Sequence, residues 1–280
     1  MNEFSRTMID GLSVSRMVIG TNWFLGYSHT SEAKSAFIKE HMDAGKIADI
    51  LEVFLAAGVD TILGQIVHEV LLEGIKIAED RTGRGIIKIG TPILDVSPSP
   101  EADDNSLRAL DEQVRNGVSV CMPHQATTDA LVDRRARTLQ DIEPITQRIR
   151  ERGRIPGLST HVPEAIVFTD EREYDIATYI QIYPAAGFLM PIEVDWIHRL
   201  IQRAKQPVLT IKPLAAGRLL PLVGLAFAWS TIRDQDMVAI GTMTPKEAEE
   251  VIEISLSILE KRTSDVELQY TRSKQVFVSA

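Results

Sequence analysis

The sequence predicts an α/β protein built as a (β/α)8 barrel, and the main evidence is a repeating pattern of strands and helices. Eight short apolar segments rich in β-branched residues recur along the 280 residues, and amphipathic segments with helical spacing separate most of them. A doubly wound open sheet is the alternative, but no glycine-rich dinucleotide fingerprint follows any of these segments. The expected strands lie within residues 16–23, 59–64, 85–93, 118–124, 155–161, 179–185, 207–214 and 236–242.

The helices between these strands are predicted from apolar residues that recur three and four positions apart. Leu51, Phe54 and Leu55 show this spacing before the second strand, and Leu107 and Leu110 show it before the fourth. No change in composition marks a second domain, so residues 1–280 are expected to form one barrel. Two additions are expected: an insertion at about 25–45, between the first strand and its helix, and a C-terminal extension at about 262–280. The insertion follows a strand, on the side where barrel active sites are built.

Composition and charge narrow the class of function. The formal net charge is −9 and no cluster of lysine and arginine is present, which argues against binding to nucleic acid. No apolar run is long enough to span a membrane, and the N-terminus lacks the apolar core of a signal peptide. The single cysteine, Cys121, cannot form an internal disulfide and is expected to be a small core residue. We therefore expect a cytoplasmic protein that binds a small-molecule substrate, with a homo-oligomer as an open alternative.

Five motifs occur in one order along the chain. They are GVDTILG at 58–64, GVSVCMPH at 117–124, GLSTH at 157–161, YIQIYP at 179–184 and TIKPLAAGRLLP at 210–221. The segment GLAFAWSTIRDQDMVAIGTMTPKEAEEV then follows, with the pattern of a helix, a strand and a helix. This series resembles the aldo-keto reductases over roughly residues 10–260. The resemblance implies the barrel fold and a pocket at the carboxyl ends of its strands.

The same resemblance implies a set of catalytic residues, of which this chain has half. In the family, NADPH supplies a hydride to a carbonyl compound, and a tyrosine delivers the proton with help from a lysine, an aspartate and a histidine. Asp60 matches the aspartate and His124 the histidine. The tyrosine has no counterpart, because the next tyrosine after Asp60 is Tyr174. Pro92, which follows Thr91, stands where the lysine is expected.

The resemblance also implies a binding site for NADP(H). Ser159 and Gln181 match residues that hold the nicotinamide amide, whereas Ile211 replaces the ring-stacking tyrosine of the family. The loops after the seventh and eighth strands offer three more residues. The residues expected to bind the cofactor are therefore Ser159, Gln181, Gly217, Thr242 and Lys246.

Two lysines are candidates for a different chemistry. Side chains alternate along a strand, so Lys88 shares a face with Gly90 and Pro92 and is expected to point into the barrel. There it would pair with Asp60, either to tune the site or as a structural ion pair. Lys212 ends the seventh strand, where desolvation would lower the pKa of its ammonium group. It would bind an anion or substrate, or form a Schiff base with a carbonyl.

The remaining candidates lie at the ends of neighbouring strands. His124 and His161 end the fourth and fifth strands, and either imidazole could act as a general acid or base. Together with Asp60 they could instead bind a divalent metal, although no metal-binding spacing supports this. Asn22 and Trp23 follow the first strand and are expected to contact substrate. His29, in the long insertion, is expected to face solvent, with an approach to the site as part of a lid as the alternative.

These observations leave three functions open. The first is a divergent reductase of a small carbonyl or sugar-like compound, which Ser159 and Gln181 favour and in which water or His124 would replace the tyrosine as proton donor. The second is a lyase, aldolase or isomerase without redox chemistry, using His124 with Lys88 or Lys212. The third is a binding protein on a reductase scaffold that has lost catalysis. Polar residues at several strand ends argue against the third function.

Overall fold

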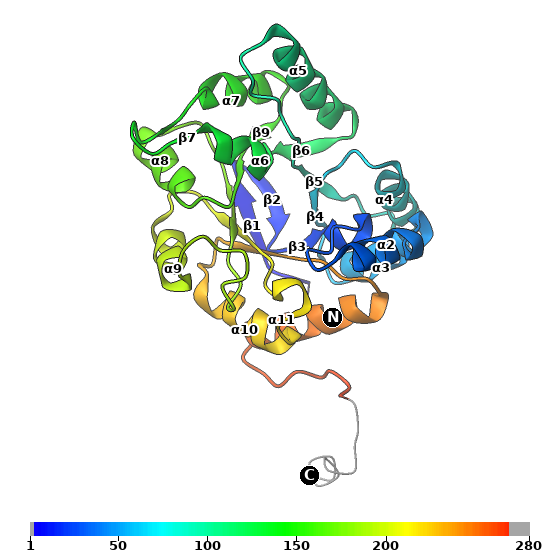
Figure 1. The fold of residues 1–280 in the computed structure, drawn as a ribbon. Helices are drawn as coiled ribbons and strands as arrows, with labels where there is room; N and C mark the ends of the chain where they lie inside the picture. Colours follow the sequence, from blue (N-terminus) through cyan, green and yellow to red (C-terminus); the bar gives the residue numbers. More distant parts are fainter. Residues whose placement is uncertain (1–2, 269–280) are drawn as a thin grey trace.

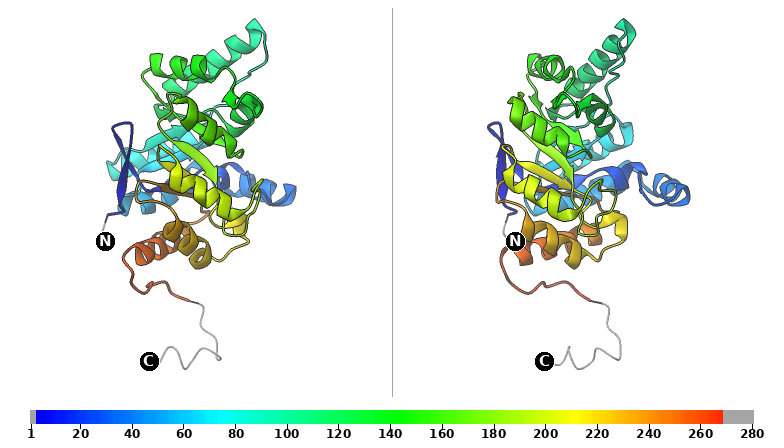
Figure 2. Two further views of the ribbon diagram at one scale, coloured as in Figure 1. Left: turned by 90° about the vertical axis from the view of Figure 1, so that its left-hand side faces the viewer. Right: turned by 60° about the vertical axis from the view of Figure 1, so that its left-hand side comes forward.

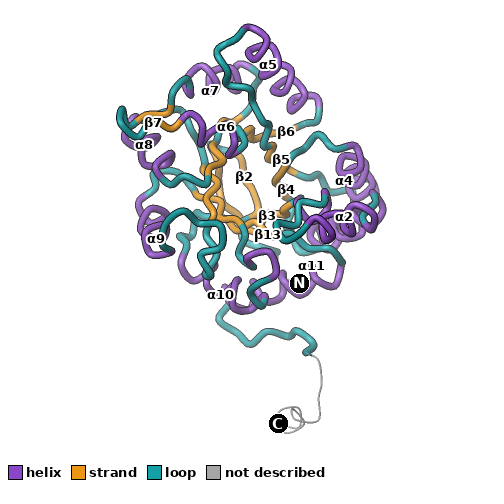
Figure 3. Tube along the Cα trace, in the orientation of Figure 1, coloured by secondary structure: helices purple, strands orange, loops and turns teal. Residues whose placement is uncertain are grey.

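The computed structural model describes residues 3–268 and confirms the predicted barrel. Eight parallel strand positions form the central sheet, and helices surround it (Figures 1 and 3). The fifth position is divided at Gly157 into β9 and β10. β9 pairs with β6, and β10 pairs with β11, so the sheet is continuous from β10 through β3 to β9. The strands are β3 (Met17–Gly20), β4 (Thr61–Gly64), β5 (Ile87–Gly90), β6 (Val118–Cys121), β9 (Ile155–Pro156), β10 (Leu158–Thr160), β11 (Tyr179–Ile182), β12 (Val208–Ile211) and β13 (Met237–Ile240).

The outer ring is formed by helices that each follow a barrel strand. Several begin with a signal that is readable in the sequence. Ser99 accepts a hydrogen bond from the backbone of Ala102 at the start of α5, and Pro100 occupies the first turn, where no N–H is needed. The ring helices are α3 (Ala44–Ala56), α4 (Glu69–Thr82), α5 (Pro100–Arg115), α7 (Ile142–Glu151), α8 (Glu164–Arg172), α9 (Val194–Arg203), α10 (Pro221–Thr231) and α11 (Pro245–Leu259).

The core has two parts, one inside the barrel and one between the strands and the helices. The inner part is built from one side chain in two along each strand, including Leu63, Ile89 and Ile180. The outer part contains the alternate residues, such as Ile62, packed against the helices. This alternation decides which strand residues can reach a pocket at the end of the barrel.

An N-terminal hairpin closes one end of the barrel, and the sequence pattern did not predict it. β1 (Arg6–Ile9) and β2 (Leu12–Ser15) pair antiparallel ahead of the first barrel strand. Ile9 and Val14 are fully buried and belong to the inner core. Figure 2 shows the hairpin on one side of the molecule and the insertion that carries α2 on the other. The hairpin therefore fills the end of the barrel where the strands begin.

The insertion after β3 contains two helices, α1 (Asn22–Leu25) and α2 (Glu32–His41). It lies at the carboxyl ends of the strands, as expected. At the other end of the chain, residues 269–280 of the predicted C-terminal extension lie outside the described residues. Within the described part of the chain, no helix combines the length and the apolar character needed to cross a membrane.

Smaller elements complete the description. The loop after β6 forms α6 (Gln125–Thr128) and a 3-10 turn, η1 (Asp129–Leu131), and a short hairpin follows, formed by β7 (Val132–Asp133) and β8 (Thr138–Leu139). The loop after β12 contains a second 3-10 turn, η2 (Ala215–Gly217). Both loops lie at the carboxyl ends of their strands, so they contribute to the face where the pocket is found.

Candidate active site

A cavity of about 610 Å³ opens where the barrel strands end. Its volume falls within the roughly 300–1,000 Å³ range of small-molecule sites. Its wall extends from the strand ends at Gly20, Thr91 and Ile211 to the first turns of α11 at Glu247 and Glu250. The sequence-predicted residues that line it are Asn22, Trp23, His124, Ser159, His161, Lys212, Gly217 and Thr242.

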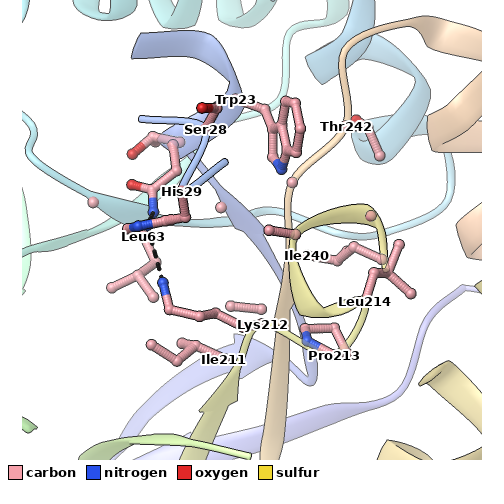
Figure 4. Close-up of a pocket in the computed structure, with 18 of the residues that line it drawn as sticks. Trp23, Ser28, His29, Leu63, Ile211, Lys212, Pro213, Leu214, Ile240 and Thr242 are labelled. Atoms are coloured by element: carbon pink, nitrogen blue, oxygen red, sulfur yellow. Dashed lines mark hydrogen bonds between the residues drawn. The ribbon is translucent and has the colours of Figure 1, made fainter. Parts of the chain in front are cut away.

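Lys212 and His29 meet inside this cavity. The Nζ atom of Lys212 lies 3.0 Å from Nε2 of His29, and Nδ2 of Asn22 lies 3.0 Å from the same imidazole nitrogen. Figure 4 shows the Lys212 side chain extending from the end of β12 toward His29. An ammonium and an amide NH2 are both donors, so Nε2 of His29 acts as the acceptor in this arrangement. His29 is therefore neutral here, with its ring proton on Nδ1.

The backbone is strained at both members of this pair. His29 has a φ of 54° and Lys212 a φ of 62°, in the left-handed region that non-glycine residues seldom occupy. Pro213 follows Lys212, which restricts the backbone of the lysine further. Residues held in such conformations cost about 1–3 kcal/mol each and gather at functional sites. Eight other non-glycine residues within 3–268 also have a positive φ, so the functional argument rests on the contact between the two side chains inside the cavity.

Hydrogen bonds of the Ser28 side chain hold the turn that carries His29. The Ser28 hydroxyl is buried, lies 2.9 Å from the hydroxyl of Ser35 on α2, and accepts a hydrogen bond from the backbone of Thr30. Gly26 ends α1 with a φ of 79°, and a Cβ atom there would lie 3.0 Å from the carbonyl oxygen of Ser35 and closer still to the Lys39 side chain. These contacts turn the chain back over the barrel and direct the imidazole of His29 into the cavity.

Burial and positive charge lower the pKa values of the cavity histidines. The pKa of His29 falls to about 4, first because of partial burial and then because of Lys212 and His161. Burial, Lys212 and His124 lower the pKa of His161 to about 4 in the same way. Burial alone lowers the pKa of Lys212 to about 8. At neutral pH the pair therefore consists of an ammonium donor and a neutral imidazole acceptor.

Replacing Lys212 by methionine should raise the pKa of both His29 and His161. The substitution removes a nearby positive charge and leaves a side chain of similar size, while burial still holds both pKa values below 6.5. Histidine ring resonances followed by NMR from pH 3 to 8 would measure both values. The surface variant Lys205→Met serves as the control, and unchanged pKa values in Lys212→Met would show that the charges do not interact.

His161 and His124 lie beside a half-buried carboxylate, Asp129. The backbone N–H of His161 faces both oxygens of Asp129 at 3.3 and 3.4 Å, and the Thr160 hydroxyl donates to one of them. Burial raises the pKa of Asp129, and these hydrogen bonds oppose that effect. His124 caps α6, accepting through Nδ1 from the backbone of Ala126 at 3.2 Å. Its Nε2 is then the ring nitrogen that carries the proton.

Two predicted site residues, Asp60 and Lys88, do not line the cavity. Asp60 forms an ion pair with Arg6 of the N-terminal hairpin, at 2.8 Å. Lys88 lies one position out of phase with the inner core, which contains Ile87 and Ile89 on β5. The expectation that Lys88 points into the barrel is therefore corrected, and the Lys88–Asp60 pair is not formed.

The contacts of Gly90 show which face of β5 points toward the helices. A Cβ atom at Gly90 would lie 2.2 Å from the side-chain oxygen of Gln113 on α5, so the Gly90 face of β5 is the face toward the helices. Thr91, not Pro92, lines the cavity. Lys88 was expected to point inward because Pro92 was taken as the inward residue that matches the family's lysine. The inward residue is Thr91, one position earlier.

Only some of the residues expected to bind NADP(H) line the cavity. Ser159, Gly217 and Thr242 line the cavity. Gln181 is fully buried but does not line the cavity. Its neighbour Ile180 occupies the inward position on β11, so Gln181 lies on the opposite face of the strand. Lys246 is not part of the lining either, and its ammonium group pairs with Glu249 at 2.6 Å.

The start of α11 forms one end of the cavity and is closed by its own side chains. Thr244 accepts from the backbone of Glu247 at 3.1 Å, and the Glu247 carboxylate accepts from the backbone of Met243 at 2.6 Å. This reciprocal arrangement resembles a capping box, but the Glu247 carboxylate accepts from the residue before the cap and not from Thr244 itself. It satisfies two of the N–H groups that an anion would otherwise use, and it puts a carboxylate in the cavity wall.

The structure does not bring together the ligands of the metal alternative. Asp60 lies with the hairpin, apart from His124 and His161. Within residues 3–268, no group of three or more histidine, cysteine, aspartate or glutamate side chains is arranged to hold a metal ion.

Sequence reasoning missed Asp129 and ranked His29 too low. His29 was expected to face solvent, with an approach to the site only as the alternative, because a histidine in a long polar insertion carries no periodic signal. Asp129 follows a short helix and matches no motif. The available signal for His29 was indirect: a long insertion directly after a barrel strand lies over the site.

The comparisons with known proteins identify the fold. No family model matches the sequence, and no curated protein is significantly similar to it. A Pseudomonas aeruginosa protein assigned to the aldo-keto reductases is 14% identical, with a TM-score of 0.65 over 92% of this chain and 98% of that one. The aldo-keto reductase of Brucella melitensis is 13% identical, with a TM-score of 0.58 over 99% and 98% of the two chains. An aldo-keto reductase solved with NADPH is 13% identical, with a TM-score of 0.57 over 96% and 91%. The chain therefore has the barrel fold of the aldo-keto reductases over nearly its whole length.

Proposed function

We propose that this protein is a nicotinamide-dependent reductase of small carbonyl compounds in which Lys212 takes the place of the usual tyrosine as proton donor. The observation that carries the proposal is the 3.0 Å contact between the Lys212 ammonium and His29 inside the cavity. No tyrosine belongs to the cavity lining. A lysine with a pKa near 8 is protonated at neutral pH yet gives up its proton more readily than an ordinary lysine.

The proposed chemistry assigns one task to each residue. The Lys212 ammonium donates to the substrate carbonyl oxygen and transfers a proton as negative charge develops there. His29, which accepts from Lys212 and Asn22, keeps the ammonium directed into the cavity. After the transfer, the unprotonated Lys212 amine regains its proton from solvent, because Nε2 of His29 is an acceptor and carries no proton to give. The Nε2–H group of His124 is a second donor in the same wall.

The cavity offers clearer binding partners for the nicotinamide half of a dinucleotide than for its other half. Ser159 would hold the nicotinamide side, and the hydroxyl of Thr242, which has no hydrogen-bond partner, lies beside the start of α11. Gly217 leaves the backbone after β12 open to close approach, because a Cβ atom there would meet nothing within 4 Å. When bound, the nicotinamide supplies the hydride. The other end presents the carboxylates of Glu247 and Glu250, with Lys246 directed to Glu249.

This asymmetry predicts a preference for NADH over NADPH. Carboxylates accept hydrogen bonds from a free ribose 2′-hydroxyl, whereas a 2′-phosphate requires a cation. We expect NADH to bind about tenfold more tightly, and Glu247→Lys to reverse much of that ratio. Titration followed by tryptophan fluorescence measures both constants, since Trp23 lines the cavity. Tighter binding of NADPH by the unchanged protein would contradict the assignment of this end of the cavity.

The reductase proposal itself is tested by turnover. Purified protein with NADH or NADPH should oxidise the cofactor when a set of small aldehydes, ketones and 2-oxo acids is supplied. The rate should fall in Lys212→Met and remain in Lys205→Met, a surface substitution of the same kind. No binding of either cofactor at millimolar concentration would overturn the proposal.

A Schiff-base enzyme is the second candidate, and the lowered pKa of Lys212 specifically favours it. A desolvated lysine is partly unprotonated near pH 8 and can attack a carbonyl carbon. In that case borohydride would trap a covalent adduct on Lys212 with a carbonyl substrate, and peptide mass spectrometry would locate it. A reductase would show cofactor oxidation and no trapped adduct.

A further inference from the structure

Lys212 is a largely enclosed cation that has no anionic partner. None of the ion pairs formed within residues 3–268 includes it, and its hydrogen-bond partner is the neutral His29. Two other enclosed cations have oxygen acceptors within the chain: Arg233 is bound to the buried carboxylate of Asp236, and Arg16 donates to the backbone carbonyls of Asp236 and Arg233. A buried ammonium without a counter-ion is costly to the folded protein. The missing partner is therefore expected to come from outside the chain.

Three imidazoles that are neutral at pH 7 line the cavity wall beside Lys212. His29, His124 and His161 all line the same wall, and Lys212 lowers the pKa of each of them. The nearby carboxylate, Asp129, is engaged by the Thr160 hydroxyl and the backbone of His161. Its negative charge thus faces the protein backbone and is not offered to the ammonium.

The other carboxylates of the cavity are engaged at its far end. Glu247 accepts from the backbone of Met243 at the start of α11, and Glu250 lies one turn further along the same helix. The cavity thus has a cation, Lys212, at one end, with three imidazoles beside it, and an anionic end, at α11. A ligand with a matching charge distribution would present its negative group to Lys212.

We propose that the substrate carries a carboxylate directly beside its reacting carbonyl, as in a 2-oxo acid, and that Lys212 with His161 forms the subsite for that carboxylate. This inference rests on the proposed function, because the Lys212 ammonium that donates to the reacting carbonyl would also bind the carboxylate. Lys212 can contact the carbonyl oxygen and a carboxylate oxygen together only if the two groups are adjacent. The carboxylate supplies the counter-ion that the folded chain lacks.

Binding of an unreactive anion tests the subsite without depending on catalysis. Oxalate, which carries the same carboxylate but cannot be reduced by hydride transfer, should bind the cofactor-free protein in calorimetry. Lys212→Met should weaken this binding about tenfold or more, and Lys205→Met should leave it unchanged. In the unaltered protein, oxalate should also raise the pKa of His161, followed by NMR, because an anion stabilises the imidazolium. Equal oxalate binding by Lys212→Met, or no rise for His161, overturns the subsite.

A comparison of two substrates separates this inference from the proposed function. Pyruvate and methyl pyruvate share the reacting carbonyl, but only pyruvate carries the charge. With NADH, kcat/KM for the 2-oxo acids of a substrate set should exceed that for their methyl esters by about 100-fold. Equal turnover of acids and esters would keep the reductase and discard the carboxylate subsite. Oxalate binding that depends on Lys212, with no turnover of any carbonyl, would keep the subsite and discard the reductase.

Discussion

Lys212→Met is expected to lower kcat by about 10²- to 10⁴-fold, the contribution that a well-placed general acid makes to proton transfer. Methionine retains the length and apolar stem of lysine, so the cavity wall and the strained turn before Pro213 should persist. The variant removes the ammonium group that donates to the carbonyl oxygen, while the Nε2–H group of His124 remains. Steady-state kinetics with the best carbonyl substrate, together with a circular dichroism melting curve, would measure activity and folding side by side.

The pH dependence of turnover gives a second test of Lys212 as the general acid. A general acid works in its protonated form, so turnover should decline as the pH rises through about 8, where Lys212 loses its proton. This alkaline limb should be absent from the residual activity of Lys212→Met. His29→Gln, which keeps an acceptor toward Lys212, should retain more activity than His29→Ala. Full activity in Lys212→Met would remove the lysine from the mechanism.

Asp236→Ala is expected to destabilise the fold by about 3–5 kcal/mol, the cost of breaking a buried ion pair by removing one partner. Asp236 is fully buried just before β13. Its carboxylate accepts two bonds from the Arg233 guanidinium, at 2.7 and 2.9 Å, and one from the backbone of Val208 at 2.8 Å. Alanine would leave a largely buried guanidinium and backbone N–H groups unpaired.

Denaturant unfolding would measure this loss. Asp234→Ala is the matched control, because Asp234 lies two residues away and is exposed. Asp236→Asn should fall between the two, since the amide oxygen still accepts from Val208 while the charge is lost. An unfolding free energy in Asp236→Ala equal to that of Asp234→Ala would mean that solvent or rearrangement replaces the carboxylate.

The fold could be predicted because its signals are local and repeated. Each barrel strand is a short apolar run, and each ring helix shows apolar residues at helical spacing, so eight repetitions specify the architecture. The N-terminal hairpin escaped prediction for the opposite reason. Its buried residues, such as Ile9 and Val14, are few, and their role depends on a barrel formed by residues far along the chain.

The site was predictable where a residue follows a strand directly. Asn22, His124, His161 and Lys212 all line the cavity, because a barrel brings the carboxyl ends of its strands together. Phase along a strand was less secure, as Lys88 shows, since one residue of shift exchanges the two faces. His29 could not be found this way, because its place depends on Ser28 and α2 folding the insertion back over the barrel.

The hairpin across the lower end of the barrel also bears on the order of events in a catalytic cycle. With Ile9 and Val14 packed into the base, ligands must arrive and depart by the same opening at the strand ends. A dinucleotide lying between Lys212 and α11 would occupy much of that opening, so it should enter before the smaller substrate and leave after the product. Such sequential kinetics would give product inhibition by the oxidised dinucleotide that is competitive with the reduced form.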